Sequence, residues 1–182
     1  MTAREPLDVV DEEDRVVGSV PRAEVHRRGL LHRSVHVFLL DRSGRLFVQR
    51  RAPTVVVHPN RWTSSASGHV DAGESYEDAA VRELSEEIGV CADVRLRGRF
   101  RYRDAVENEW SALFEAHYDG EVALDAAEVA EGRFVTLDEL ARWIAKDAFA
   151  FSPSFLTALA CWRQAGGKGG RALAGAPPAD TV

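Results

Sequence analysis

Cysteine is scarce in this chain. Only two cysteines occur among its 182 residues, Cys91 and Cys161, and they form neither a metal-binding spacing nor a disulfide framework. We expect both to be free thiols, as in a reducing cytosol. Long apolar runs are also absent, so no segment is predicted to cross a bilayer, and the first residues lack the apolar core of a signal peptide. These features predict a soluble, cytoplasmic protein.

Positive charge is in deficit. Lysine and arginine number 23 against 29 aspartates and glutamates, which gives a formal net charge of −6. This balance argues against nonspecific binding to nucleic acid or to an anionic membrane, so we expect neither as a partner. A polyanionic ligand would have to be held by local cations or by a bound metal. The remaining composition, 45% hydrophobic and 29% charged, is that of an ordinary globular protein.

The length fits one domain. We predict a single domain over residues 1–165 and a flexible tail over residues 166–182, which are rich in glycine, alanine and proline. The predicted strands are residues 7–10, 16–20, 32–40, 45–49, 92–104, 108–118 and 131–135. The predicted helices are one turn at 21–26, then 76–88, 136–146 and a last helix from 152. This order favours an α/β fold with a mixed sheet between helices.

The most informative stretch runs from residue 68 to residue 90. It reads as a glycine-rich loop followed by a helix, with Ser75 as the N-cap and Gly89 as the stop. Apolar residues recur at i, i+4 and i+8 on one face of that helix, namely Ala80, Leu84 and Ile88, with Val81 beside them. We therefore expect the helix to pack on the sheet through this face.

The opposite face of the same helix is acidic. Glu83, Glu86 and Glu87 stand at i, i+3 and i+4, so their carboxylates converge on one patch, and only Arg82 lies close by. An isolated pattern of this kind is more often a solvated acidic face. Here the surrounding residues favour a hard divalent cation instead, since Mg²⁺ and Mn²⁺ prefer oxygen ligands.

This stretch matches the Nudix box, Gly-x5-Glu-x7-Arg-Glu-apolar-x-Glu-Glu-x-Gly-apolar, at every specified position. The matching residues are Gly68, Glu74, Arg82, Glu83, Leu84, Glu86, Glu87, Gly89 and Val90. The chain therefore resembles the Nudix hydrolase superfamily. The resemblance implies an α/β/α sandwich and a metal-dependent attack of water on a small-molecule diphosphate linked to another group, X. We expect the substrate to be a nucleoside di- or triphosphate or a related compound, with Mg²⁺ or Mn²⁺ as the cofactor.

The resemblance also suggests roles for single residues. Metal ligands are expected to be Glu83, Glu86, Glu87 and the carbonyl of Gly68, and the base that takes the proton from water is Glu86, Glu83 or Glu109. The residues expected to bind substrate are Arg50, Arg51, His69 and Arg82. Of these, the arginines at 50 and 51 could equally be ordinary surface residues, and Arg82 is better placed to orient the glutamates beside it.

Outside the box the chain resembles type I isopentenyl-diphosphate isomerases. The likeness rests on residues 31–40, 50–52, 62–63, 68–69, 100–103, 107–109 and 150–153. It implies a second metal site at His26, His32, His69, Glu107 and Glu109, although the first two histidines are spaced one residue closer here. The alternative for each histidine is a hydrogen-bonded structural role. An isomerase is therefore the second functional hypothesis.

Two departures favour the hydrolase. The isomerases use a cysteine thiol just before their Gly-His pair, and this chain has Ser67, whose hydroxyl is a far weaker acid. They also lack the complete Arg-Glu-x-x-Glu-Glu helix. A third hypothesis, a module that binds a nucleotide without cleaving it, would require erosion of the metal glutamates, and they are all present. The identity of X and the formation of a homodimer are left open.

Overall fold

A computed structural model describes residues 6–166 of the chain. The elements, in order, are β1 (Leu7–Val10), β2 (Val16–Val20), α1 (Arg22–Arg28), β3 (His32–Leu40), β4 (Leu46–Arg51), β5 (Trp62–Thr63), β6 (Ala66–His69), α2 (Tyr76–Ile88), β7 (Val94–Arg103), β8 (Asn108–His117), β9 (Val129–Val135), α3 (Leu137–Lys146), a 3₁₀ turn at Ala148–Ala150 and α4 (Pro153–Gln164). The predicted tail lies outside the described residues from position 167 onward.

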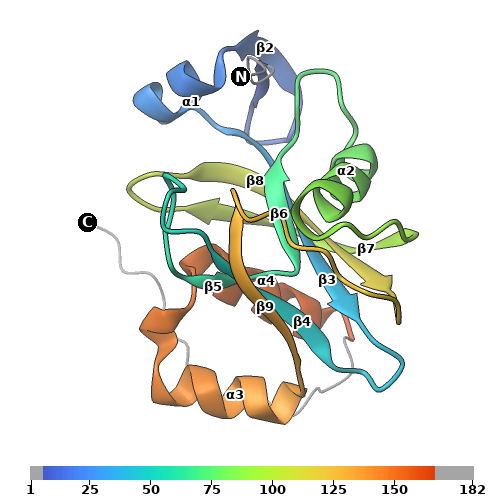
Figure 1. Cartoon of the computed structure of the whole chain (residues 1–182). Coiled ribbons are helices and arrows are strands. Elements are labelled where there is room, and N and C mark those ends of the chain that lie inside the picture. Colours follow the sequence, from blue (N-terminus) through green and yellow to red (C-terminus); the bar gives the residue numbers. More distant parts are fainter. Residues whose placement is uncertain (1–5, 167–182) are drawn as a thin grey trace.

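Strand β3 is the centre of the sheet (Figure 1). It pairs antiparallel with β6 and parallel with β8, and β8 pairs antiparallel with β7. β4 touches β3 only at Leu46 opposite Leu40, and then continues beside β5 and β9. The sheet therefore opens between β6 and β4. At this opening the Ser65 hydroxyl accepts from the Leu39 amide at 2.7 Å and donates to the Phe47 carbonyl at 2.6 Å, which holds the two parts together.

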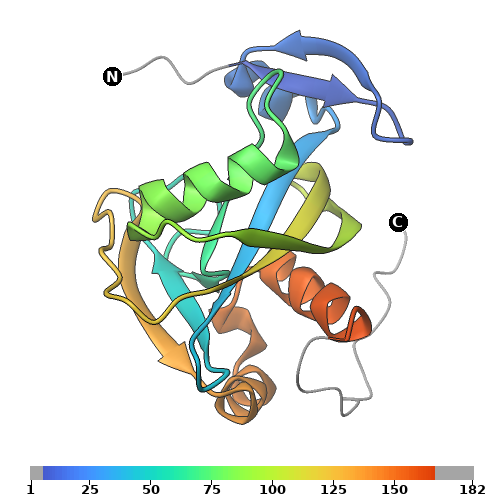
Figure 2. The ribbon, with the colours of Figure 1, turned by 90° about the vertical axis from the view of Figure 1, so that its right-hand side faces the viewer.

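Helices cover both faces of the sheet, as Figure 2 shows for α2 and α4 on either side of β3. The alternation along β3 explains this arrangement, because Val35, Val37 and Leu39 face one side while Phe38 and Leu40 face the other. The first set packs on the buried apolar stripe of α2, which is Ala80, Leu84 and Ile88. The second set packs on the stripe of α4, which is Phe155, Leu159 and Trp162. The predicted α/β/α sandwich with a mixed sheet is confirmed.

Helix α2 begins and ends as the sequence predicts. The Ser75 hydroxyl accepts a hydrogen bond from the Asp78 amide at 3.1 Å, and Gly89 adopts φ 66°. One detail of its apolar face is wrong, since Val81 is exposed and Ala79 is buried in its place. With both ends fixed and one side packed on β3, the acidic side of α2 has a defined position at the opening of the sheet.

Two short strands were not predicted. β5 is only two residues long, too short for a pattern of alternation, and in β6 alanine, serine and glycine give little strand signal. Elsewhere the boundaries shift by a few residues, for example β4 extends to Arg51 and β9 begins at Val129.

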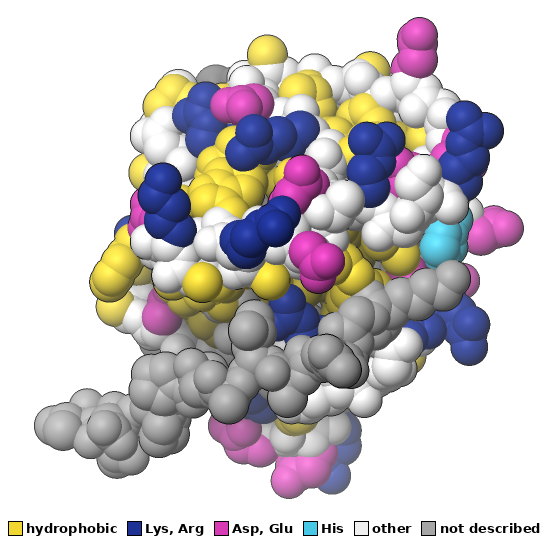
Figure 3. Space-filling model, turned by 90° about the horizontal axis from the view of Figure 1, so that it is seen from below, with side chains coloured by type: hydrophobic (Ala, Val, Ile, Leu, Met, Phe, Trp, Pro, Cys, Tyr) yellow, Lys and Arg dark blue, Asp and Glu magenta, His cyan; other side chains and the backbone are white. Residues whose placement is uncertain are grey.

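Figure 3 shows the face of the molecule that is lowest in Figure 1, and on this face basic and acidic side chains lie among apolar ones. None of the helices described here has both the length and the apolar character needed to span a bilayer.

Candidate functional site

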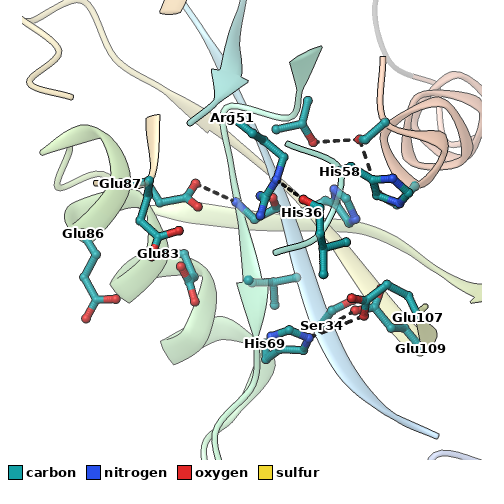
Figure 4. Close-up of a pocket in the computed structure, with 18 of the residues that line it drawn as sticks. Ser34, His36, Arg51, His58, His69, Glu83, Glu86, Glu87, Glu107 and Glu109 are labelled. Atoms are coloured by element: carbon teal, nitrogen blue, oxygen red, sulfur yellow. Dashed lines mark hydrogen bonds and ion pairs between the residues drawn. The ribbon is translucent and has the colours of Figure 1, made fainter. Parts of the chain in front are cut away.

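A cavity of about 600 Å³ lies at the opening of the sheet. Its walls come from α1, β3, the β4–β5 loop, β6, α2, the β7–β8 turn and the beginning of α4. Figure 4 shows Glu83, Glu86 and Glu87 entering from α2, with Glu107 and Glu109 at a separate place beside His69. The cavity thus holds two acidic groups, one on the helix and one on the strands.

The three glutamates of α2 differ in their surroundings. Glu83 and Glu87 are buried, whereas the side chain of Glu86 is 61% exposed. Glu83 lies against the backbone of Gly68 so closely that a β-carbon at this position would overlap its carboxylate. Glu87 accepts hydrogen bonds from Gln49 Nε2 at 2.5 Å and from the Ser67 amide at 3.1 Å. The glycine is therefore required for the close approach of the helix to β6.

Burial of these carboxylates changes their protonation. Desolvation, followed by repulsion from Glu83, raises the pKa of Glu87 to about 8. Desolvation also raises the pKa of Glu83, against the opposing attraction of Arg82. Without a cation the pair therefore retains a proton near neutral pH. These converging carboxyl groups cannot all ionise without a nearby cation. Their oxygen atoms are the ligands that a hard divalent cation prefers.

Arg82 braces this arrangement. Its Nε and Nη2 donate to the two oxygens of Glu74 at 2.8 and 2.9 Å, and Nη2 also donates to the His69 carbonyl at 2.9 Å. Its Nη1 donates to Glu83 at 2.7 Å and to Glu86 at 3.3 Å. Each nitrogen of the guanidinium already has a partner, which favours the orienting role over direct contact with substrate.

The arginines at the end of β4 point to opposite sides, as neighbours in a strand do. Arg51 lines the cavity, and its Nε donates to the Val57 carbonyl at 2.8 Å. Arg50 does not line the cavity, and its Nε instead donates to Glu131 at 3.2 Å. The structure therefore brings one of the two predicted arginines into the site.

The second acidic group includes three histidines. His26 comes from α1, His32 from β3, His69 from β6, and Glu107 and Glu109 from the turn and first residues of β8. His32 Nε2 lies 3.7 Å from Glu107 and 3.6 Å from Glu109, and His69 Nε2 lies 3.6 Å from each of them. His26 Nδ1 lies 3.8 Å from Glu107. The sequence expectation that these five residues meet is matched in space, despite the shorter spacing of the first two histidines.

We call His26, His32, His69, Glu107 and Glu109 the His/Glu centre. The distances between their side chains suit a shared cation. They exceed a hydrogen bond, and the buried atoms His32 Nε2, His69 Nε2 and both oxygens of Glu107 have no hydrogen-bond partner among the described residues. Two ligands that each lie about 2.1 Å from one ion stand roughly 3–3.5 Å apart, which is close to the spacing here. Four of the five residues offer ligand atoms within 4.8 Å of one another, namely His26, His32, His69 and Glu107.

The pKa shifts at the His/Glu centre also favour binding of a cation. Desolvation lowers the pKa of His69 to about 3 and also lowers that of His26, so both rings are neutral and can act as ligands. Desolvation and then repulsion from Glu107 raise the pKa of Glu109. Burial opposes ionisation of Glu107, but its interactions with His32 and His69 outweigh burial and lower its pKa.

Several cavity residues were not predicted from the sequence. These are Arg22, Ser34, His36, His58, Asp125 and Glu128. The alternation on β3 could have found two of them, because His32, Ser34 and His36 stand at i, i+2 and i+4 and share one face. The others lie in loops or on α1, where no spacing rule applies.

Comparison with known sequences identifies the family. The model of the NUDIX domain matches residues 30–157. A Nudix hydrolase of Pseudomonas aeruginosa is 44% identical over 127 residues, which cover 69% of this chain and 75% of that protein. A Nudix hydrolase of Streptomyces coelicolor is 41% identical over 174 residues, 92% of this chain and 95% of that protein. An isopentenyl-diphosphate Delta-isomerase of Nocardia farcinica is 38% identical over 174 residues, 90% of this chain and 99% of that protein.

Solved structures agree on the fold. The crystal structure of DR0079 from Deinococcus radiodurans aligns with a TM-score of 0.72 at 27% identity, over 87% of this chain and 99% of that one. A MutT protein from Methanosarcina mazei aligns with a TM-score of 0.63 at 17% identity, over 75% and 93%, which shows a shared fold alone. From the domain match, the relatives and the complete box on α2, we conclude that this chain belongs to the Nudix family.

Proposed function

We propose that this protein hydrolyses the diphosphate linkage of a nucleoside di- or triphosphate or a related conjugate, with Mg²⁺ or Mn²⁺ bound at α2. Membership of the Nudix family supports hydrolysis of pyrophosphate bonds in small molecules by an enzyme that uses divalent metal. The finer assignment depends on one observation. Glu83, Glu86 and Glu87 share the wall of a cavity of about 600 Å³ that also contains the guanidinium of Arg51.

We assign metal binding, phosphate binding and proton transfer to residues of this wall. Glu83, Glu86 and Glu87, with the Gly68 carbonyl, would hold the metal, which would neutralise the diphosphate and lower the pKa of a bound water. Arg51 would bind a phosphate oxygen, since guanidinium suits that geometry. Water attacks phosphorus, its oxygen forms the new bond, and the bridging P–O bond breaks. The exposed carboxylate of Glu86 is the best placed to accept the proton, with Glu83 and Glu109 as further candidates.

We also propose that the His/Glu centre holds a second divalent ion. Its imidazole nitrogens fit Zn²⁺ better than Mg²⁺, and its converging carboxylates also suit Mn²⁺. His69 would then be a ligand at this centre, rather than a direct contact to substrate as the sequence suggested. Because the centre lines the same cavity as α2, a diphosphate could reach both.

Isomerisation of a prenyl diphosphate is the second candidate function. The assembled His/Glu centre and the relatives named isopentenyl-diphosphate Delta-isomerase favour it. The hydroxyl at Ser67 weighs against it, because a hydroxyl is a poor proton donor to an alkene. The complete set of α2 glutamates supports hydrolysis, so we place the isomerase second.

For the rest of the chain, we propose that residues 1–165 act as a single domain and that the enzyme works in the cytoplasm.

Loss of a single α2 carboxylate tests the proposed chemistry. Glu86→Gln and Glu87→Gln should each lower metal-dependent phosphate release by about 100-fold or more, because metal catalysis supplies several kcal/mol and each ~1.4 kcal/mol is tenfold in rate. Glu77→Gln, on an exposed turn of the same helix, is the matched control and should keep wild-type turnover. Turnover at the wild-type level in both test variants, measured as phosphate released from a panel of nucleotides, would contradict the assignment.

Removal of metal should make stability depend on pH through Glu87. Below the ordinary pKa of 4.5 this carboxyl is protonated in both states, and between there and about 8 only the unfolded state ionises. Stability of the chelator-treated protein should therefore fall as pH rises through this window, by up to about 1.4 kcal/mol per unit from this residue. The free energy of unfolding, measured with urea, should depend less steeply on pH in Glu87→Gln than in wild type. In Glu77→Gln its dependence on pH should be that of wild type. A profile of Glu87→Gln as steep as that of wild type would refute the buried, protonated Glu87.

The His/Glu centre has its own test. His32→Asn should weaken binding of Mn²⁺ or Zn²⁺ at one site by at least about 100-fold, because even indirect supports of a metal ligand typically contribute about 10–100-fold. His117→Asn is the matched control, since the His117 side chain is 67% exposed and outside the cavity. Calorimetric titration of the metal-free protein measures both. Equal affinity and stoichiometry in His32→Asn and wild type would show that no ion binds there.

A further inference from the structure

The cavity has a polar wall that the catalytic groups do not account for. Five hydroxyl side chains line it, namely Ser34, Thr63, Ser67, Ser152 and Ser154. The apolar side chains among the described lining residues are only Val35 and Val57, and no phenylalanine, tyrosine or tryptophan is among them. This lining belongs to a site for a polar group.

His36 stands among these hydroxyls. It is 3% exposed, and its Nδ1 is 2.7 Å from the Ser64 hydroxyl. Burial lowers the pKa of His36 to about 4, so the ring is neutral at physiological pH. Figure 4 shows it in the cavity between Arg51 and His58. A neutral imidazole can donate or accept a hydrogen bond, which suits a neutral ligand group.

The hydroxyls are held in place before any ligand arrives. Ser152 donates to Thr63 Oγ1 at 3.0 Å, and its oxygen accepts from the Phe155 amide at 3.3 Å as the N-cap of α4. The Ser154 hydroxyl lies 3.5 Å from that of Ser152. We call His36, Thr63, Ser67, Ser152 and Ser154 the hydroxyl wall. It offers several neutral donors and acceptors at fixed positions.

These properties narrow the occupant. An alkyl chain would leave the buried polar groups unpaired, which is costly. A base held by stacking finds no phenylalanine, tyrosine or tryptophan among the described lining residues, whose aromatic rings are the imidazoles of His36, His58 and His69. Arg51 lines the same cavity as Glu87 and His36, so its guanidinium suits the diphosphate itself.

We propose that the hydroxyl wall recognises a neutral, hydroxyl-rich group, that is, a sugar attached directly to the diphosphate. The inference rests on the proposed function, since it places the diphosphate at α2 and Arg51 and the sugar next to them. For a sugar diphosphate, the water oxygen joins the terminal phosphorus and the bridging P–O bond breaks. The products are the sugar phosphate, inorganic phosphate and one proton.

A series of diphosphates that differ only in the attached group tests this inference. With the metal-loaded full chain, we would compare kcat/KM for methyl diphosphate, n-pentyl diphosphate and ribose 5-diphosphate. Sites that hydrogen-bond a substrate hydroxyl reject analogues without it by factors of about 10⁴–10⁵, so a preference of at least about 100-fold for ribose over pentyl is expected. Uridine and adenosine diphosphates test whether a base on the sugar changes kcat/KM relative to ribose 5-diphosphate. Values for both within about tenfold of ribose 5-diphosphate are expected, because the wall would bind the sugar that all three compounds carry and the lining offers the base no large aromatic ring.

Substitutions in the hydroxyl wall test whether it causes the preference for ribose over pentyl diphosphate. Thr63→Val combined with Ser154→Ala should narrow the ribose-to-pentyl ratio by at least about tenfold, since each change removes a hydroxyl from the wall and little volume. Thr157→Ala is the matched control, because it removes a hydroxyl from α4 that faces away from the cavity. Its ratio should equal that of wild type. Thermal unfolding confirms that each variant is folded, and the wild-type series decides the question on its own if the double variant is not.

The outcomes separate this inference from the proposed function. Equal turnover of n-pentyl and ribose diphosphates would overturn the sugar assignment while leaving hydrolysis in place. A ratio that does not change in the double variant, or a nucleotide cleaved while ribose 5-diphosphate is no better than n-pentyl, would overturn it too. Absence of metal-dependent phosphate release from every compound would instead contradict the proposed function.

Discussion

The burial of four glutamates in one cavity is the constraint on which this structure depends. Glu83, Glu87, Glu107 and Glu109 are each at most 9% exposed, and isolated carboxylates do not ionise easily in such surroundings. The chain supplies few compensating cations of its own. Arg82 pairs with Glu83, while histidines surround Glu107 and Glu109, and burial lowers the pKa of two of them, His26 and His69. A divalent metal at each place, as proposed above, would offset this excess of charge and would supply the metal catalysis used in diphosphate hydrolysis.

The sheet creates the room for this chemistry. If β4 paired with β3 along its whole length, the strands would close the space that the glutamates now occupy. Instead β4 meets β3 at one residue pair, and β6 takes its place along the rest of β3. Gly68 on β6 lets α2 approach until Glu83 touches the backbone, so the acidic side of the helix enters the opening. The same opening receives His69 from β6 and His36 from β3, which connects the fold directly to the site.

Much of the catalytic helix could be predicted from the sequence, because its signals are local. Caps, apolar period and acidic spacing all lie within residues 75–89, and the structure differs from the prediction only at Val81, which is exposed where Ala79 is buried. The remaining site depends on register between distant strands, which a single sequence does not specify. Arg50 and Arg51 look alike in sequence, but only their position in β4 decides that Arg51 alone faces the cavity. Thr63 carries no motif, and it meets the N-cap of α4 only in the folded chain, where Ser152 donates a hydrogen bond to it.

The central claim is that this enzyme transfers a phosphoryl group to water. The most direct test incubates the metal-loaded protein with uridine diphosphate and, separately, with isopentenyl diphosphate in deuterium oxide enriched in ¹⁸O. We predict ¹⁸O in the inorganic phosphate released from the nucleotide and no deuterium in recovered isopentenyl diphosphate. Deuterated dimethylallyl diphosphate, formed without release of phosphate from either compound, would contradict the account and make the protein an isomerase.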